Sequence, residues 1–558
     1  MTISTEQNSS SACVNVDAAC DGADKKGYFV TGDVVNDMKL VNSALSKYSI
    51  SDKAKEEPLF LKDNKLVVIE KSHNLNIDRT IYRTVAVDKG RLELILTSAV
   101  GAEQWAYNTS GKNYKMGIPS RLLETVLSAG RNYLDGSVKE LNGIHSGVLL
   151  TPSGKIVTAG GYNEDTGLYL TKDYTGCVGP LPPIVTGEDV AKAKKVLWDI
   201  FGEFNFVDKE MGEESVHYQN TIAAVFTMIV RPTWKGSLPL WVVSKSSERS
   251  GGSLLQTVAG VVAYGSAPVK GTFPEYREEY EKMIDSYVND GVQYAMIDNV
   301  VEGKSWVTPA LLSLSTGDGC VSGRVFGAKT IAEHPPSTFF AFNGINIEMR
   351  ADVTGRVIVT SIVPDQSWQS LKYSMSETAL INLATKKHPE VVRSFAIFYR
   401  WWKQNGNEKP NDIEGNFDAH QKWCDVIMAV LNSVGYENIM ANLKSLQIDD
   451  NDAEHEHAEM LKAISNKFDV GVTFPPGALA LYLMEQGQDR KDNPGKGGNG
   501  LMAFPEKIIS CAMNSTLTPT QIGIALSKIK DRIVPGVDYH LVKKNRDYVL
   551  VRNVKKNT

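Results

Sequence analysis

Apolar and polar positions alternate along the chain with two different periods. Between residues 27 and 173, short apolar runs such as 66–69 and 92–96 are separated by turn residues, which predicts β-strands. Residues 119–134 instead show helical spacing. The pattern predicts a mixed α/β domain in this part of the chain.

The middle of the chain changes to longer segments. Residues 186–204 read as an amphipathic helix with acidic residues in its first turn, where the helix dipole favours them, and residues 217–230 read as a second helix. From residue 238 to residue 363, apolar strands alternate with helices. Such alternation predicts a parallel sheet covered by helices.

The last third of the chain begins as a run of helical segments over residues 377–485, which predicts a helical bundle. The Gly-rich and charged residues 487–500 have the composition of a flexible linker. Beyond them, Thr518 and Gln521 form a capping-box pattern at a helix start, and two apolar strands flank a basic turn. Helices followed by a hairpin with a basic tip predict a winged helix.

Composition excludes several classes of protein. The 558 residues are 42% apolar and 22% charged, with a net charge of −5, so the chain has no global basic bias toward nucleic acid. The six cysteines lack C-x-x-C spacing, which argues against a zinc cage or a disulfide framework. Because no apolar run approaches the roughly 18 residues of a membrane span, we expect a cytoplasmic protein without membrane contact.

A loop between an apolar strand and a helix is the first candidate site. An apolar strand over residues 238–243 leads into a loop over 244–253 and then into a helix from residue 254. This order of strand, Gly-rich loop and helix is the one with which P-loop proteins hold phosphates. Gly252 occupies the position where the G-x-x-x-x-G-K-[ST] pattern has lysine. The candidate nucleotide-binding residues are Lys245, Arg249, Ser250, Gly251, Gly252 and Ser253. Lys245 and Arg249 lie close enough in the chain to replace the missing lysine, and the alternative is that both are solvated loop charges.

Two further polar residues end apolar strands after this loop. Asp298 could hold Mg²⁺ together with the hydroxyl of Ser253, because Mg²⁺ prefers oxygen ligands, although strands also end in plain Asp-Asn turns. Asn343 follows a second strand, residues 337–342. ATP and Mg²⁺ are therefore the expected ligands.

Taken in order, these segments resemble the AAA+, superfamily-3-like replication ATPases of prophages and other mobile elements, often described as primase/helicase proteins. The resemblance extends from about residue 60 onward and is carried by residues 161–169, 295–300, 323–327 and 417–423. It implies an α/β fold with an AAA+ P-loop-type parallel sheet core. No primase signature is visible, so the primase label is not extended to this chain.

The resemblance also implies roles for single residues. Asp298 would carry Mg²⁺, Asn343 would position the attacking water, and Arg350 or Arg356 would reach the nucleotide of a neighbouring subunit in a ring, perhaps a hexamer, on DNA. For each arginine alone, a surface salt bridge is the plainer interpretation. The family's lysine is replaced by Gly252, and only Arg356 remains of its paired arginines. We therefore expect ATP turnover to be weak or absent.

The C-terminal residues carry a local excess of positive charge. Residues 528–558 hold nine Lys and Arg residues against three Asp, which would attract phosphates in a salt-sensitive way. A solubilising tail is the alternative. The candidate DNA-binding residues are Lys528, Lys530, Arg532, Lys543, Lys544 and Arg546.

Six regions are predicted along the chain. They are a disordered tail over 1–27, an N-terminal mixed α/β domain over 28–178, an AAA+ ATPase-like core over 184–376, a helical domain over 377–486, a linker over 487–503, and a winged-helix DNA-binding domain over 504–558. The function predicted for them is that of a replication-associated ATPase or helicase-like protein. Alternatives are a non-catalytic DNA-binding initiator or scaffold that keeps the shape for assembly, or a regulator.

Overall fold

The structure is a computed structural model of the chain. It describes residues 28–553 except 75–78, 101–104, 111–112, 131–132, 135, 152, 248–249, 275, 301–305, 317–320, 325–330, 335–337, 348–350, 364–373, 411–416, 418–419, 444–456, 494–498 and 532–536. The predicted tail over residues 1–27 lies outside these ranges. By contacts the chain forms two units, residues 1–348 with 356–412 and 417–440, and residues 349–355 with 413–416 and 441–558.

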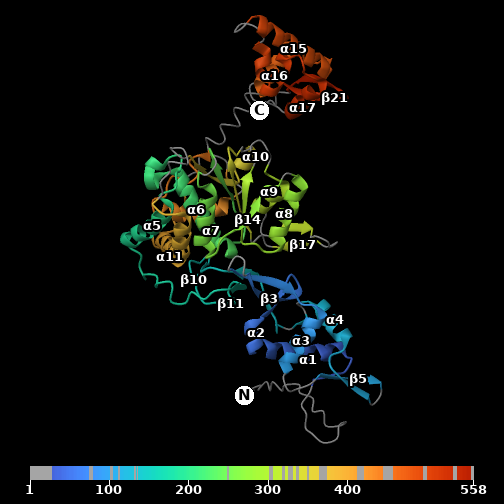
Figure 1. Cartoon of the computed structure of the whole chain (residues 1–558), viewed down its shortest axis with the longest axis vertical. Coiled ribbons are helices and arrows are strands. Elements are labelled where there is room, and N and C mark those ends of the chain that lie inside the picture. Colours follow the sequence, from blue (N-terminus) through green and yellow to red (C-terminus); the bar gives the residue numbers. More distant parts are fainter. Residues whose placement is uncertain are drawn as a thin grey trace, which may run out of the picture. The chain divides into compact units, whose positions relative to one another are not determined.

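The N-terminal module, blue in Figure 1, is the mixed α/β structure that the sequence predicts. A four-stranded sheet has the order β4-β3-β2-β7, and a three-stranded sheet has the order β1-β5-β6. The elements are β1 (Tyr28–Val30), α1 (Val34–Ser49), α2 (Asp52–Glu56), β2 (Leu59–Lys62), β3 (Lys65–Asn74), β4 (Arg79–Ala86), α3 (Lys89–Val100), β5 (Trp105–Ser110), β6 (Asn113–Met116), α4 (Ser120–Ala129) and β7 (Lys139–Glu140).

One strand prediction in this module is wrong. Residues 92–96 belong to helix α3, in which Leu92, Ile95 and Leu96 are buried and Leu94 is 71% exposed. Buried positions three and four residues apart are the spacing of a helix face. A run of five residues contains both this spacing and the alternation of a strand, and packing against the module's core decided between them.

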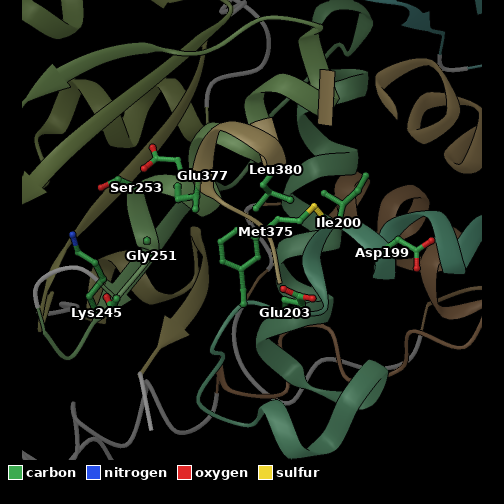
Figure 2. A pocket seen from close by; sticks show the side chains of 13 residues that line it. Asp199, Ile200, Glu203, Lys245, Gly251, Ser253, Met375, Glu377 and Leu380 are labelled. Atoms are coloured by element: carbon green, nitrogen blue, oxygen red, sulfur yellow. The ribbon is translucent and has the colours of Figure 1, made fainter. Parts of the chain in front are cut away.

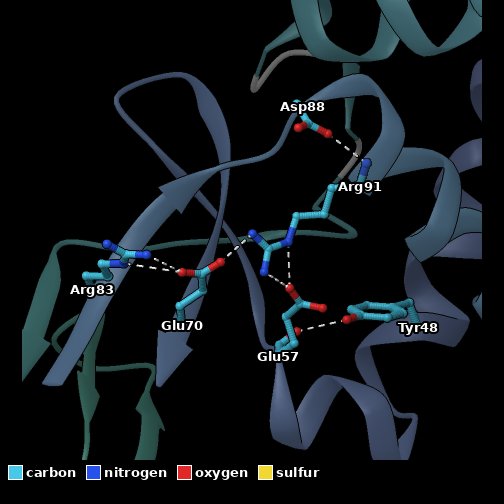
Figure 3. A network of polar contacts seen from close by, with 6 residues as sticks. All are labelled: Tyr48, Glu57, Glu70, Arg83, Asp88 and Arg91. Atoms are coloured by element: carbon cyan, nitrogen blue, oxygen red, sulfur yellow. Dashed lines mark hydrogen bonds and ion pairs between the residues drawn. The ribbon is translucent and has the colours of Figure 1, made fainter. Parts of the chain in front are cut away.

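A polar network joins α3 to the sheet and to the end of α2 (Figure 3). Arg91 donates from Nη1 to Glu70 Oε1 over 2.7 Å and from Nε to Glu57 Oε1 over 2.6 Å. Arg83 donates from Nη2 to the other Glu70 oxygen over 2.9 Å. The hydrogen bonds from Arg91 and then from Arg83 lower the pKa of Glu70.

This network predicts a pH dependence for the module. Because the pKa of Glu70 is lower in the folded state, its contribution to stability is full above the unfolded pKa of about 4.3 and is lost as the pH falls through the folded pKa. Glu70→Gln should therefore destabilise the module by up to about 1 kcal/mol at pH 7 and less below about pH 4. Hydrogen exchange of β3 peptides, corrected for intrinsic rates, measures this. Glu124→Gln, which removes an exposed pair with Lys89, is the control, and equal effects of both variants would contradict the prediction.

Short strands follow the module. They are β8 (Gly143–His145), β9 (Leu149–Leu150), β10 (Ile156–Val157), β11 (Gly161–Asn163) and β12 (Leu168–Leu170). Residues 161–169, which carry part of the resemblance, lie in the hairpin of β11 and β12, and β12 pairs in parallel with β8.

A five-stranded sheet, entirely parallel, forms the centre of the first unit, as the alternation of strands and helices predicts. Its strand order is β14-β15-β18-β13-β19. The strands are β13 (Leu240–Lys245), β14 (Val269–Thr272), β15 (Tyr294–Val300), β18 (Phe339–Ile345) and β19 (Val357–Ile362). A two-stranded hairpin, β16 (Val321–Arg324) and β17 (Ile331–His334), lies between β15 and β18 in the chain. Residues 240–243 of β13 and 339–343 of β18 are buried, as strands covered on both faces require.

Helices pack against this sheet. The predicted helix over 186–204 is α5, which begins with a capping box between Thr186 and Asp189, and the predicted helix over 217–230 is α6. The helices of this part are α5 (Gly187–Phe201), α6 (Val216–Val230), α7 (Gly252–Tyr264), α8 (Arg277–Asn289), α9 (Pro309–Thr316) and α11 (Glu377–Gln404). No helix in the described ranges has the length and apolar character to cross a bilayer.

The predicted helical domain over 377–486 is divided between the two units. Helix α11 contacts α5 and α7, and Phe395 stacks on Phe226 of α6 with ring centroids 4.6 Å apart. Trp423, at the end of α12 (Gln421–Trp423), donates to Thr227 of α6 over 2.8 Å. The described residues of 377–410 and 417–440 therefore extend the core of the sheet, while helical residues from 457 onward belong to the second unit.

The second unit has its own apolar core. Its three-stranded sheet has the order β20-β22-β21, and β21 and β22 form the predicted hairpin. The predicted capping box of Thr518 and Gln521 opens α17. The elements are β20 (Thr473–Phe474), α15 (Pro476–Asp492), α16 (Glu506–Met513), α17 (Pro519–Ile529), β21 (Tyr539–Lys544) and β22 (Asp547–Arg552).

The predicted linker over 487–503 differs from the structure. Helix α15 continues to Asp492, and Leu501 is fully buried in the core of the second unit. Gly487 faces α16 so closely that a Cβ there would lie 2.9 Å from the backbone of Ala512. This glycine allows two helices to approach, a role that composition cannot distinguish from that of a linker glycine. Residues 494–498 lie outside the described ranges.

Candidate nucleotide-binding site

The strand, loop and helix predicted to hold phosphate are β13, residues 246–251 and α7. Gly251 precedes the helix with φ of 96°, a left-handed conformation that favours glycine. Gly252 and Ser253 then form the first turn of α7, whose free N–H groups and dipole attract anions. Because the sheet is parallel, this turn lies at the edge where the other strands also end.

Ser253 and Asp298 meet at this edge. The Ser253 hydroxyl donates to Asp298 Oδ2 over 2.9 Å, although the two residues lie 45 positions apart in the chain. Lys270 of the neighbouring strand β14 places its Nζ 3.7 Å from the same carboxylate oxygen. The serine hydroxyl and the acid, which the sequence suggests as joint Mg²⁺ ligands, thus form one cluster.

Asn343 lies inside β18, between the strand of the loop and the strand of the acid. Its Nδ2 donates to Gln256 Oε1 over 3.1 Å and to Ser253 Oγ over 3.3 Å. Gln256 donates from its own amide to Phe342 O over 3.0 Å, which fixes the direction of both amides. The Oδ1 of Asn343 is buried without a hydrogen-bond partner among the described residues. It remains an acceptor for a water molecule or a ligand.

A cavity of about 400 Å³ opens beside the loop (Figure 2). Figure 2 shows Lys245, Gly251 and Ser253 on one side, Ile200, Glu203 and Asp199 on the other, and Glu377 close to Ser253 in this view. Away from the loop, the cavity is lined by four apolar residues and three carboxylates: Asp199, Ile200, Glu203, Phe204, Met375, Glu377 and Leu380. A pocket with a phosphate-type loop on one side and apolar side chains on the other suits a ligand with an anionic end and a flat apolar end.

The described loop residues of the predicted set all line this cavity: Lys245, Ser250, Gly251, Gly252 and Ser253. Lys245, the last residue of β13, is only 8% exposed. Arg249 and Arg350 lie outside the described residues.

Arg356 does not join the cluster. It precedes β19, which pairs with β13 from Leu240↔Val357 to Lys245↔Ile362, so it lies at the amino edge of the sheet. The site lies at the carboxyl edge, about 20 Å away for strands of six residues. The role of Arg356 toward a neighbouring subunit stays a prediction.

The candidate DNA-binding residues lie in the second unit. Lys543, Lys544 and Arg546 are exposed at the tip of the hairpin of β21 and β22, which we call the basic tip. Lys530 follows α17, and its Nζ lies 3.4 Å from Oδ2 of Asp531. Lys528 lies in α17 with its side chain outside the described part, and Arg532 lies outside it entirely. An exposed hairpin turn with three cations suits contact with phosphates.

Sequence reasoning missed Lys270, Gln256 and the cavity wall from α5 and α11. Lys270 reaches Asp298 because β14 pairs with β15, and Gln256 reaches Asn343 because α7 packs on β18. No local motif contains either residue. Only the helical spacing of Gln256 after Ser253, three positions along α7, could have suggested that both face one site.

No family model matches the chain, and no curated protein sequence matches it. Among solved structures, the A form apo structure of the NrS-1 C-terminal region is 14% identical, with a TM-score of 0.37, and the match covers 91% of this chain and 100% of that one. The X-ray structure of JCV helicase is 13% identical, with a TM-score of 0.20, and the match covers 47% of this chain and 73% of that one. These similarities are too weak to carry an argument about function.

Proposed function

We propose that the chain binds ATP with Mg²⁺ in the cavity beside α7 and works as an AAA+-type ATPase associated with DNA replication of a phage or other mobile element. The observation that carries this proposal is the 2.9 Å contact between Ser253 and Asp298 at the N-terminus of α7. A hydroxyl and a carboxylate at this distance are the hard oxygen donors that suit Mg²⁺.

Each part of the site has a task in this proposal. The N–H groups of the first turn of α7 would hold phosphate oxygens, and Mg²⁺ on Ser253 and Asp298 would neutralise charge on the β- and γ-phosphates. The apolar side chains of α5 and α11 would contact the base, and their carboxylates would accept from the ribose hydroxyls. The Oδ1 of Asn343 would accept from the attacking water.

The strand order supports the AAA+ part of the proposal. Strand β18 lies between the strands that carry the loop and the acid, so its polar residue reaches the same cluster. The family that the sequence resembles uses a polar amide after this strand to orient the attacking water. A ring of subunits, with Arg356 facing the nucleotide of the neighbour, and DNA held by the basic tip complete the proposal.

Nucleotide binding and turnover, measured together with oligomer size, test the proposal. We expect fluorescent ATP to bind more tightly with Mg²⁺ than with EDTA, slow phosphate release, and faster release when DNA is added. Mass photometry with and without ATP would report the ring. Binding without any turnover would instead favour a non-catalytic scaffold. A wild-type chain that binds no nucleotide at millimolar ATP would contradict the proposal.

A further inference from the structure

A neighbouring side chain, and not the backbone conformation, explains why position 252 is a glycine. Gly251 has a positive φ, but Gly252 does not, so its conformation is open to any residue. A Cβ built on Gly252 would lie 2.7 Å from Cδ and 3.0 Å from Cγ of Lys245, and 3.3 Å from Cγ1 of Val243. The aliphatic part of Lys245 thus fills the space that a side chain at position 252 would need.

From this contact we infer that Lys245 supplies the phosphate-binding cation that position 252 lacks, and that Gly252 is the matching change that makes room for it. The inference rests on the proposed nucleotide function. Lys245 and the loop residues Ser250–Ser253 line the same cavity, and Figure 2 shows the Lys245 side chain extending beside Gly251. The lysine reaches the loop from the end of β13 instead of from the start of α7.

Burial supports this assignment over that of a solvated surface charge. Lys245 is more than nine-tenths buried, whereas an ordinary loop lysine keeps its ammonium group in water. Solvent screens an ion pair less at a largely buried residue than at the surface, so an anion held against this lysine would be bound more firmly than at an exposed one. The triphosphate of ATP is such an anion.

The geometry makes the two positions exclusive. Since one aliphatic chain already fills the space beside Val243, a second lysine at 252 would have to displace Lys245. Adding a lysine at 252 alone is therefore expected to give no gain in ATP affinity. Combining Lys245→Gly with Gly252→Lys moves the lysine to position 252 and removes the side chain that would clash with it.

Four variants and two ligands test the inference. Lys245→Met should weaken MgATP binding by about 10- to 100-fold, the usual loss for a charge-assisted hydrogen bond, and should leave binding of adenosine unchanged. Gly252→Ala should weaken MgATP binding in the same direction by displacing Lys245. The double exchange should recover most of the loss. Lys192→Met, which removes an exposed lysine paired with Glu188 on α5, should change neither affinity.

The outcomes separate this inference from the proposed function. If the wild-type chain binds MgATP and Lys245→Met binds it equally well, the inference is wrong and the nucleotide site stands. Equal losses for MgATP and adenosine would also overturn it, because they would indicate a structural role for Lys245. If the wild-type chain binds neither ligand, the proposed function itself is wrong. Failure of the double exchange while Lys245→Met lowers only MgATP affinity would overturn the matching role of Gly252.

Discussion

Asp298→Asn is expected to lower ATP turnover by about 10²- to 10³-fold, the loss typical of a preorganised electrostatic group. Asparagine has nearly the same shape and can still accept a hydrogen bond from Ser253, but it lacks the negative charge that would hold Mg²⁺. The fold should therefore persist while the metal site is lost. Phosphate release at saturating ATP measures the rate, and titration of ATP with and without Mg²⁺ measures the metal's contribution to binding.

The matched control is Asp290→Asn, which removes one carboxylate just after α8 and before β15, at the amino edge of the sheet and so opposite the edge that carries the site. It should leave turnover and the Mg²⁺ effect unchanged. Equal turnover in the wild-type chain and in Asp298→Asn would remove Asp298 from the site. If the wild-type chain binds ATP without hydrolysing it, ATP affinity with and without Mg²⁺ becomes the measurement. Asp298→Asn should then abolish the gain in affinity from Mg²⁺.

Neutralising the basic tip is expected to have the second large effect. Replacing Lys543, Lys544 and Arg546 by alanine should weaken DNA binding by roughly 10- to 100-fold at low salt, because three exposed cations at a hairpin turn would no longer contact phosphates. Three lost phosphate contacts, at about 0.9 each, should reduce the slope of log K against log salt by up to about 2.7. Fluorescence anisotropy with labelled DNA over a range of salt concentrations measures both.

A control with the same change in charge is available in the same unit. Lys462, Lys467 and Lys491 are exposed lysines outside the hairpin, and their triple alanine variant also removes three positive charges. It should keep most of the affinity and most of the salt slope. Equal losses in both variants would indicate a general charge effect and would contradict a specific role for the basic tip.

Substitution of the tip is also more informative than truncation. A deletion after residue 514 would remove Ile522, Leu526 and Leu541, all fully buried in the core of the second unit. Loss of DNA binding would then follow from unfolding alone. The exposed tip residues can be changed without opening that core.

The agreement between sequence and structure at the candidate site has a simple cause. The predicted loop follows β13 and the predicted acid lies on β15, and residues at the carboxyl ends of parallel strands share one edge of a sheet. Once the alternation of strands and helices indicates a parallel sheet, Ser253 and Asp298 are expected to be near each other. The roles of these residues in catalysis stay predictions.

Other features of the site depend on neighbours that the chain order does not reveal. Lys270 contacts Asp298 because β14 pairs beside β15, and the cavity wall comes from α5 and α11, about 50 residues before and 120 residues after the loop. The loop sequence shows a missing lysine, but the contact between Lys245 and Gly252 depends on the path of one side chain. Such contacts follow from packing, which motif spacing does not describe.

Features determined by local chemistry could be read directly from the residues: the capping boxes at Thr186 and Thr518, the hairpin around Asn545, and the parallel core strands. The capping boxes and the hairpin form hydrogen bonds between residues close in the chain, and the core strands are marked by local runs of apolar residues. Packing between distant residues decided the rest. It placed residues 92–96 in a helix, divided the predicted helical domain between two units, buried Leu501 of the predicted linker, and set Lys245 against Gly252, because the free energy of each depends on which remote surface it covers.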